Sequence, residues 1–148
     1  MRLKEKVSII TGAASGFGEG IAKKFSEEGA KLILVDINKD LLEKVSKDLN
    51  QDLFHTDVSS SSSMKKLSEY VLKKYRTIDI MVNNAGITHL PKPLEEVEEE
   101  EFDKVFAVNS KSVFLCGKFF VPHMKKQKKG SILNISSTAG ISPRPNLN

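Results

Sequence analysis

The sequence predicts an α/β fold of three layers, in which helices cover both faces of a doubly wound parallel sheet. Short runs rich in β-branched residues alternate with longer segments whose apolar residues recur at helical spacing. The first run ends in a glycine-rich segment, TGAASGFG at residues 11–18, of the kind that joins a strand to a helix. Right-handed crossovers then place five strands in the order 3-2-1-4-5, within one domain covering residues 1–148.

The first half of the chain supplies three of these strands, at residues 7–11, 31–36 and 52–56. The helix after the glycine-rich segment ends at Gly29, a residue type favoured at helix C-termini, and Asp40 can begin the next helix. The apolar faces of the two helices are formed by Ile21, Ala22, Phe25, Leu41, Leu42, Val45 and Leu49.

The second half supplies two more strands, at residues 78–82 and 131–135. The serine run 59–63 is expected to begin a helix rather than to form a linker, because apolar residues at helical spacing follow it directly. A long helix follows the acidic segment 95–101, and Pro122 is expected to end or bend it. The apolar positions of these two helices are Met64, Leu67, Val71, Leu72, Phe102, Val105, Phe106, Val113 and Phe114.

Charge and hydropathy exclude two kinds of partner. The formal net charge is only +4, and the chain has no tryptophan and two tyrosines to stack on bases, so nucleic acid is not an expected partner. The one dense basic stretch, residues 125–129, suits the C-terminal end of a helix. No apolar run approaches the ~20 residues that span a bilayer, so no membrane partner is expected either.

The cysteine and histidine content indicates a reducing compartment and predicts no metal site. Cys116 is the only cysteine and cannot form an internal disulfide, so we expect a cytoplasmic protein. Its place among apolar residues of a predicted helix favours a packing role over a nucleophilic one. The three histidines, His55, His89 and His123, are scattered without metal-ligand spacing.

The glycine-rich segment has the pattern of a phosphate-binding loop. Gly12 allows a tight turn, Gly16 lets the backbone approach a pyrophosphate, and Gly18 lets the helix pack closely on the sheet. The N-terminus of the helix offers unpaired N–H groups to an anion. A plain strand-to-helix turn is the alternative, but an acid at the end of the next strand favours a dinucleotide site.

That acid, Asp36, indicates which dinucleotide binds. A carboxylate at the end of the second strand can accept hydrogen bonds from the ribose hydroxyls of adenosine, and it would repel a 2′-phosphate. Ser15 stands where a loop that prefers the phosphate would carry a basic residue. The sequence therefore favours NAD over NADP, although Asp36 could instead be a turn residue that caps the next helix.

Five motifs in this order resemble the short-chain dehydrogenase/reductase family, and the resemblance covers the whole chain. They are TGxxxGxG at 11–18, Asp57 with Val58, NNAG at 83–86, Asn109 in the long helix, and NISS at 134–137. The resemblance implies a Rossmann-type fold and an NAD(P)-dependent oxidoreductase that transfers hydride between a secondary alcohol and a ketone. It also implies a homo-oligomer, a dimer or tetramer, in the full-length form.

The resemblance also implies roles for individual residues. Asn109 would hold a water molecule of a proton relay, Ser137 would donate a hydrogen bond to the substrate oxygen, and Ser136 would be structural. Asn83 and Asn84 would tie adjacent strands together and shape the cleft. Coenzyme contacts are implied for Gly12, Ser15, Gly16, Phe17, Gly18, Asp36, Ile37, Asp57, Val58, Asn84, Ala85 and Gly86.

The family's remaining catalysts are a tyrosine and, four positions on, a lysine, placed just beyond the last residue of this chain. We therefore expect a fragment truncated at its C-terminus, with residues 136–148 in a loop, weak NAD binding, marginal stability and no hydride transfer. Tyr70 and Lys74 fit the spacing, but they lie on the helix before the fourth strand, far from the strand ends, and are interpreted as a surface pair.

Two other functions fit parts of the sequence. A non-catalytic NAD(P)-binding module could serve as a redox sensor or interaction protein, and a Tyr-x-x-x-Lys just beyond Asn148 would favour the enzyme over it. A nucleotide-dependent methyltransferase also uses a glycine-rich loop and an acid after the second strand, but it has no place for the NNAG and NISS segments.

Overall fold

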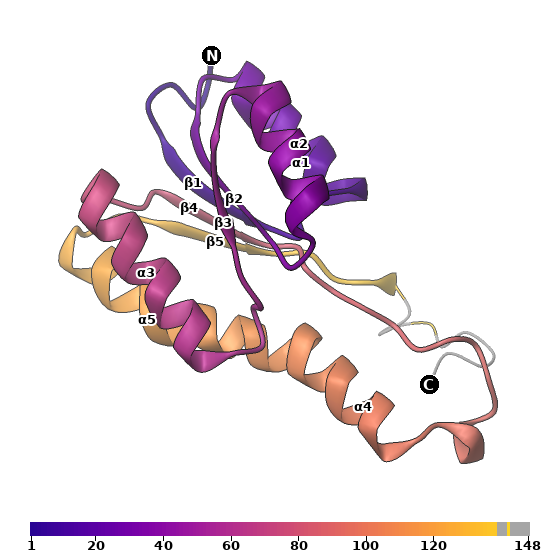
Figure 1. Ribbon diagram of the computed structural model, residues 1–148. Coiled ribbons are helices and arrows are strands. Elements are labelled where there is room, and N and C mark those ends of the chain that lie inside the picture. Colours follow the sequence, from indigo (N-terminus) through magenta and orange to yellow (C-terminus); the bar gives the residue numbers. More distant parts are fainter. Residues whose placement is uncertain (139–141, 143–148) are drawn as a thin grey trace.

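The structure, a computed structural model, describes residues 1–138 and 142 and has the predicted α/β architecture (Figure 1). Its elements in chain order are β1 (Val7–Thr11), α1 (Gly16–Glu27), β2 (Lys31–Asp36), α2 (Lys39–Leu49), β3 (Asp52–His55), α3 (Ser61–Tyr75), β4 (Ile80–Asn83), η1 (Leu94–Glu96), α4 (Glu99–Phe106), η2 (Ala107–Lys111), α5 (Ser112–Lys126) and β5 (Ser131–Asn134).

All five strands are parallel and lie in the order β3-β2-β1-β4-β5, which confirms the predicted topology. In the centre of the sheet Ile9 of β1 lies opposite Ile33 of β2 and Met81 of β4. The third and fifth strands each end one residue earlier than predicted, and β4 begins two residues later. The point where the strand order reverses lies between β1 and β4, so the ends of these two strands frame the expected site.

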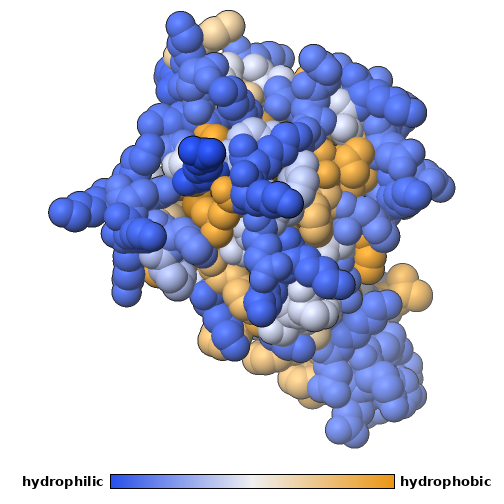
Figure 2. Space-filling view, turned by 60° about the vertical axis from the view of Figure 1, so that its left-hand side comes forward, coloured by the Kyte–Doolittle hydropathy of each residue, from blue (hydrophilic) through white to orange (hydrophobic). Residues whose placement is uncertain are grey.

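Two hydrophobic cores lie on the two faces of the sheet. Ile9 and Ile33 face α3 and α5, where they pack with Phe120 and other buried residues. Ile10 and Leu34 face α1 and α2 and pack in the other cluster. Burial on both faces explains why the strand runs are continuously apolar rather than alternating. The outer surface is mainly hydrophilic, with apolar side chains in separate patches (Figure 2).

Helix starts follow local capping, and one prediction about them is wrong. Ser60 caps α3 by accepting a hydrogen bond from the Ser63 amide at 3.3 Å, which confirms the serine run as a helix start. The helix α2 begins at Lys39 and not at Asp40, because the side chain of Asn38 accepts a hydrogen bond from the Leu41 amide at 3.1 Å.

The long helix is continuous over α4, η2 and α5, with a π-helical turn at residues 107–111, and Pro122 does not end it. A proline removes one backbone hydrogen bond from a helix interior. Phe120 and Met124 on either side of it are buried in the core, and this packing holds the helix as far as Lys126. In the last turn Lys125 and Lys126 fulfil the expectation for the basic stretch.

Cys116 of α5 packs in the core beneath the sheet, as predicted. Burial raises the pKa of its thiol to about 11, so almost no thiolate exists at neutral pH. The residue is therefore a packing residue and not a nucleophile.

Candidate functional site

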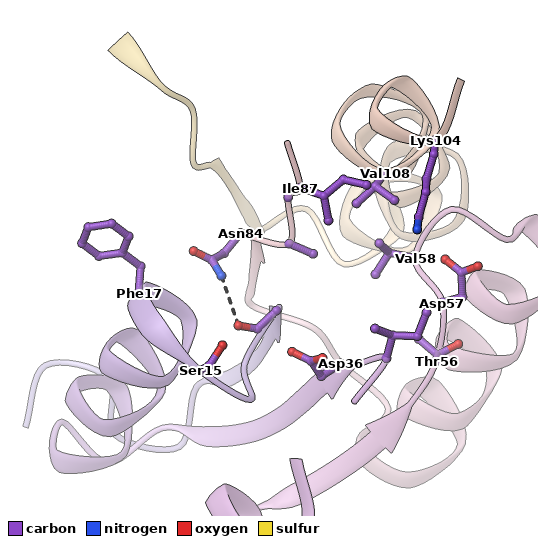
Figure 3. Close-up of a pocket in the computed structure, with 14 residues that line it drawn as sticks. Ser15, Phe17, Asp36, Thr56, Asp57, Val58, Asn84, Ile87, Lys104 and Val108 are labelled. Atoms are coloured by element: carbon purple, nitrogen blue, oxygen red, sulfur yellow. Dashed lines mark hydrogen bonds between the residues drawn. The ribbon is translucent and has the colours of Figure 1, made fainter. Parts of the chain in front are cut away.

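A cleft of about 520 Å³ lies beyond the carboxyl ends of β1 to β4 (Figure 3). The loops that follow these four strands form most of its wall, and α4 and η2 close one side. Its lining residues are Gly12, Ser15, Phe17, Asp36, Ile37, Thr56, Asp57, Val58, Asn84, Ala85, Gly86, Ile87, Lys104 and Val108. All the residues predicted to contact the coenzyme are among them except Gly16 and Gly18, which belong to the same glycine-rich loop.

The glycine-rich loop packs backbone against backbone. A Cβ at Gly18 would stand 1.9 Å from the carbonyl oxygen of Gly12, so only glycine lets α1 approach the loop so closely. At Gly16, by contrast, φ is +57° and no atom of the described chain lies within 4 Å of a Cβ position. The side chain of Ser15, the N-cap residue, does not cap α1. The loop thus forms an open cradle at a helix N-terminus, a place that favours an anion.

Thr11 and Asn84 join this loop to the end of β4. The Asn84 side chain donates hydrogen bonds to the carbonyl oxygens of Thr11, at 3.0 Å, and Gly12, at 3.3 Å. In return, Thr11 Oγ1 accepts from the amides of Asn84 and Ala85, both at 3.0 Å. This confirms that Asn84 ties β1 to β4 at the switch point.

Asn83 makes the corresponding link to the edge of the sheet. Its side-chain amide donates a hydrogen bond to Asn134 Oδ1 of β5 at 2.8 Å. The two consecutive asparagines therefore fix the strand ends on both sides of β4 and hold the cleft in shape.

Asp36 stands at the end of β2 with its carboxylate fixed by two backbone amides. Oδ2 accepts a hydrogen bond from Ala14 N at 3.0 Å, and Oδ1 accepts from Asn38 N at 2.9 Å. A carboxylate oxygen can accept two hydrogen bonds, so each oxygen keeps a lone pair for a ligand. The bond to Asn38 means that Asp36 also shapes the turn before α2, as the alternative interpretation expected.

Asp57 and Val58 form the wall beyond β3. Asp57 Oδ1 accepts hydrogen bonds from the amide of Ser59 at 2.8 Å and from its hydroxyl at 2.7 Å. These bonds fix the carboxylate beside Val58, whose side chain is buried. Together they present one polar and one apolar group at the β3 end of the cleft.

Asn109 and Ser137 do not line the cleft. Asn109 Oδ1 accepts from Ile87 N at 2.9 Å, and its amide nitrogen donates to Ile87 O at 2.8 Å. These two bonds fasten the loop after β4 to the π-helical turn, and the water-holding role stays a prediction. Ser137 follows β5 with an exposed side chain, and its predicted contact with substrate stays a prediction as well.

Tyr70 and Lys74 lie at the opposite edge of the sheet from the cleft, as predicted. Tyr70 Oη donates to Asp52 Oδ2 at 3.0 Å, Tyr75 Oη donates to the same atom at 2.6 Å, and Lys74 pairs with it too. Asp52 is the first residue of β3, whereas the cleft lies beyond the last one. Burial, followed by the hydrogen bond to Asp52, raises the pKa of Tyr75, which makes it a poorer proton donor.

Sequence reasoning missed four lining residues, Thr56, Ile87, Lys104 and Val108. Three of them are chain neighbours of predicted residues, so extending each motif by one position would have found them. Lys104 lies one helical turn before Val108, and helical spacing alone connects it to the site.

Two searches of the described residues gave no further site. Within residues 1–138 and 142, no group of three His, Cys, Asp or Glu side chains is placed to hold a metal ion. Over the same part of the chain, none of the helices has the length and apolar character needed to cross a membrane.

The sheet order, the glycine-rich loop and the cleft at the switch point define a Rossmann-type nucleotide-binding domain. The family model described as short chain dehydrogenase matches residues 6–148, and the chain belongs to this family.

Individual relatives agree with this assignment. The chain is 42% identical over 150 residues to a 3-oxoacyl-[acyl-carrier-protein] reductase of Thermotoga maritima, covering 98% of this chain and 61% of that protein. It is 41% identical to zerumbone synthase of Zingiber zerumbet, covering 95% of this chain and 55% of that protein. The chain thus spans roughly three fifths of the length of these relatives.

Solved structures share the fold closely. The crystal structure of a 3-ketoacyl-(acyl-carrier-protein) reductase from Brucella melitensis, complexed with NADH, superimposes with a TM-score of 0.93 at 42% identity, covering 97% of this chain and 62% of that one. A metagenomic short-chain oxidoreductase in complex with NADP gives a TM-score of 0.94 at 32% identity, covering 99% of this chain and 69% of that one.

Proposed function

We propose that this chain forms the coenzyme site of an NAD-dependent dehydrogenase that moves hydride between a secondary alcohol and a ketone. One observation carries the proposal, the order of groups along the carboxyl edge of the sheet. The open glycine-rich loop follows β1, the Asp36 carboxylate follows β2, and Asp57 with Val58 follows β3. A dinucleotide along this edge would place its diphosphate, ribose and adenine against these groups in turn.

The preference for NAD rests on Asp36. Its carboxylate is held in place by Ala14 and Asn38, so it could not turn away from a 2′-phosphate, and like charges at contact distance repel. The relatives do not decide the matter, since one solved structure holds NADH and the other NADP.

The chain's own residues supply part of the chemistry. The nicotinamide coenzyme, when bound, supplies the hydride-transfer chemistry. Ser137 would hydrogen-bond the substrate oxygen, and Asn109 would hold a water molecule for the proton relay. Both tyrosines of the sequence hydrogen-bond Asp52 at the far edge of the sheet, so neither can serve as the proton donor. We therefore propose that these 148 residues alone bind coenzyme without turnover.

Isothermal titration calorimetry with NADH and NADPH tests the coenzyme site. We expect wild type to bind NADH at least tenfold more tightly than NADPH, which corresponds to about 1.4 kcal/mol. The D36N variant, which loses the charge, should narrow that ratio to below about threefold. D40N is the matched control, since Asp40 is an exposed acid at the start of α2 that does not line the cleft. Tighter binding of NADPH by wild type would contradict the proposal.

We also propose that the whole protein is a cytoplasmic homo-oligomer that uses the long helix as its interface. Phe102, Phe106 and Phe114 expose 61%, 57% and 64% of their surface, a large apolar area for one helix. The helix is acidic where it begins and basic where it ends, so an antiparallel second copy would meet opposite charges. The single buried cysteine supports a reducing compartment. Sedimentation of wild type and F106D would test the interface.

A further inference from the structure

Lys104 is the one cation among the residues that line the cleft, where the other charged groups are Asp36 and Asp57. It lies in the last turn of α4, and its ammonium group points into the cleft toward Val58 and Asp57 (Figure 3). Within the described part of the chain it forms no ion pair, and the structure thus leaves both the ammonium and the Asp57 carboxylate available to a ligand.

The strand order tells which part of a dinucleotide would reach Lys104, and this step rests on the proposed function. The ribose lies at Asp36 beyond β2, so the base lies further along the same edge, beyond β3. Val58 and Val108 supply apolar surface for the faces of a base there. Asp57 and Lys104 then stand at the end of the base that is remote from the sugar.

We propose that Lys104 and Asp57 together recognise the adenine base. The edge of adenine opposite its sugar carries the amino group N6, a donor, beside the ring nitrogen N1, an acceptor. Asp57 accepts from N6, and Lys104 donates to N1. Hypoxanthine presents the reverse pattern on this edge, with a carbonyl oxygen facing Asp57 and a protonated N1 facing Lys104. Lys104 is thus a specificity-determining residue for the coenzyme base.

Calorimetric titration with NADH and with reduced nicotinamide hypoxanthine dinucleotide tests the role of Lys104. We expect wild type to favour NADH by at least tenfold, since a site built around hydrogen bonds rejects a ligand that reverses them. The K104M variant, which keeps the length of the side chain, should bind NADH about tenfold more weakly. Its affinity for the hypoxanthine analogue should change less than threefold, so the preference nearly disappears.

Two further variants separate recognition of the base from a loss of charge or of fold. K104R keeps a cationic donor and should retain most of the preference for NADH. Lys111 is an exposed lysine seven positions further along the same continuous helix and outside the coenzyme cleft, so K111M should behave as wild type. Circular dichroism establishes that each variant is folded before titration, and a variant that is not folded is replaced by K104Q.

Several outcomes would overturn the inference. Equal loss of both dinucleotides in K104M would mean that Lys104 acts through charge alone, and unchanged binding would mean that it does not touch the base. In either case wild type still binds NADH and the proposed function stands. Folded wild type that binds neither dinucleotide would contradict the proposed function itself, and this inference with it.

Discussion

Replacing Gly18 with alanine perturbs the closest backbone contact of the site. The added Cβ would stand 1.9 Å from the carbonyl oxygen of Gly12 and 2.6 Å from Nδ2 of Asn84, whereas ordinary contact begins at 3.4 Å. A carbonyl oxygen is part of the backbone and cannot rotate out of the way. Relief therefore requires α1 to move away from the glycine-rich loop.

The size of the effect follows from opposing contributions. Alanine in place of glycine inside a helix is favourable by about 0.5 to 1 kcal/mol. Overpacking costs about 1 to 3 kcal/mol, and separation of helix and loop also weakens the bond from Asn84 to Gly12, worth about 1 kcal/mol. We expect a net loss of about 2 kcal/mol in the free energy of unfolding, together with weaker NADH binding.

Gly20 provides the matched control two residues further along the same helix. It is exposed, and no atom of the described chain lies within 4 Å of its Cβ position. G20A should therefore be more stable than wild type by up to about 1 kcal/mol. Urea denaturation followed by circular dichroism measures both variants, provided that the slope m is unchanged. If G18A matched G20A in stability and bound NADH normally, the reasoning about close packing would be refuted.

Three other substitutions test separate features. Ser8 Oγ is buried in β1 without a hydrogen-bond partner among the described residues, so S8A should raise the free energy of unfolding by about 1 kcal/mol in urea denaturation. A loss of stability would contradict this. Burial raises the pKa of Asp79, but the hydrogen bond from Val7 N and the Lys129 ammonium outweigh it and hold that pKa below 3.8. Its stabilisation is therefore complete above pH 3.8 and lost as the pH falls through the lower, folded pKa. D79N should cost about 2 kcal/mol at pH 7 and progressively less below pH 3.8, and a difference independent of pH would exclude this role. N109A should speed hydrogen exchange of the Ile87 amide, whereas N109D, which keeps the acceptor oxygen, should not; equal rates would show that the contact is dispensable.

The sheet could be predicted from sequence because a buried parallel strand needs a continuous apolar run. β1 and β2 have the predicted bounds for this reason, and the strand order follows from the handedness of the crossovers. Helix boundaries were less certain. Asn38 and Asp40 are both good N-cap residues, and only the folded backbone places the Asn38 side chain against the Leu41 amide.

The motifs placed most of the cleft, but contacts between distant segments were beyond their reach. The spacing of glycines and the acid after β2 are local patterns, so residues such as Gly12 and Asp36 could be identified from them. The bonds from Asn109 to Ile87 join residues 22 positions apart, and a prediction of the long helix says nothing about which loop it meets. Lys104 lies in no motif, and it reaches the cleft only because α4 folds over the end of β3.

Chemical-shift mapping by NMR tests most directly whether a dinucleotide lies along the carboxyl edge of the sheet. Uniformly ¹⁵N-labelled chain is titrated with NADH, and the backbone amides are followed. The amides of residues 12–18, 36–38 and 57–58 should shift, while those of Ile78 and Asp79, at the amino edge near β4, should not. Shifts confined to the amino edge, or none at saturating NADH in a folded sample, would contradict the account.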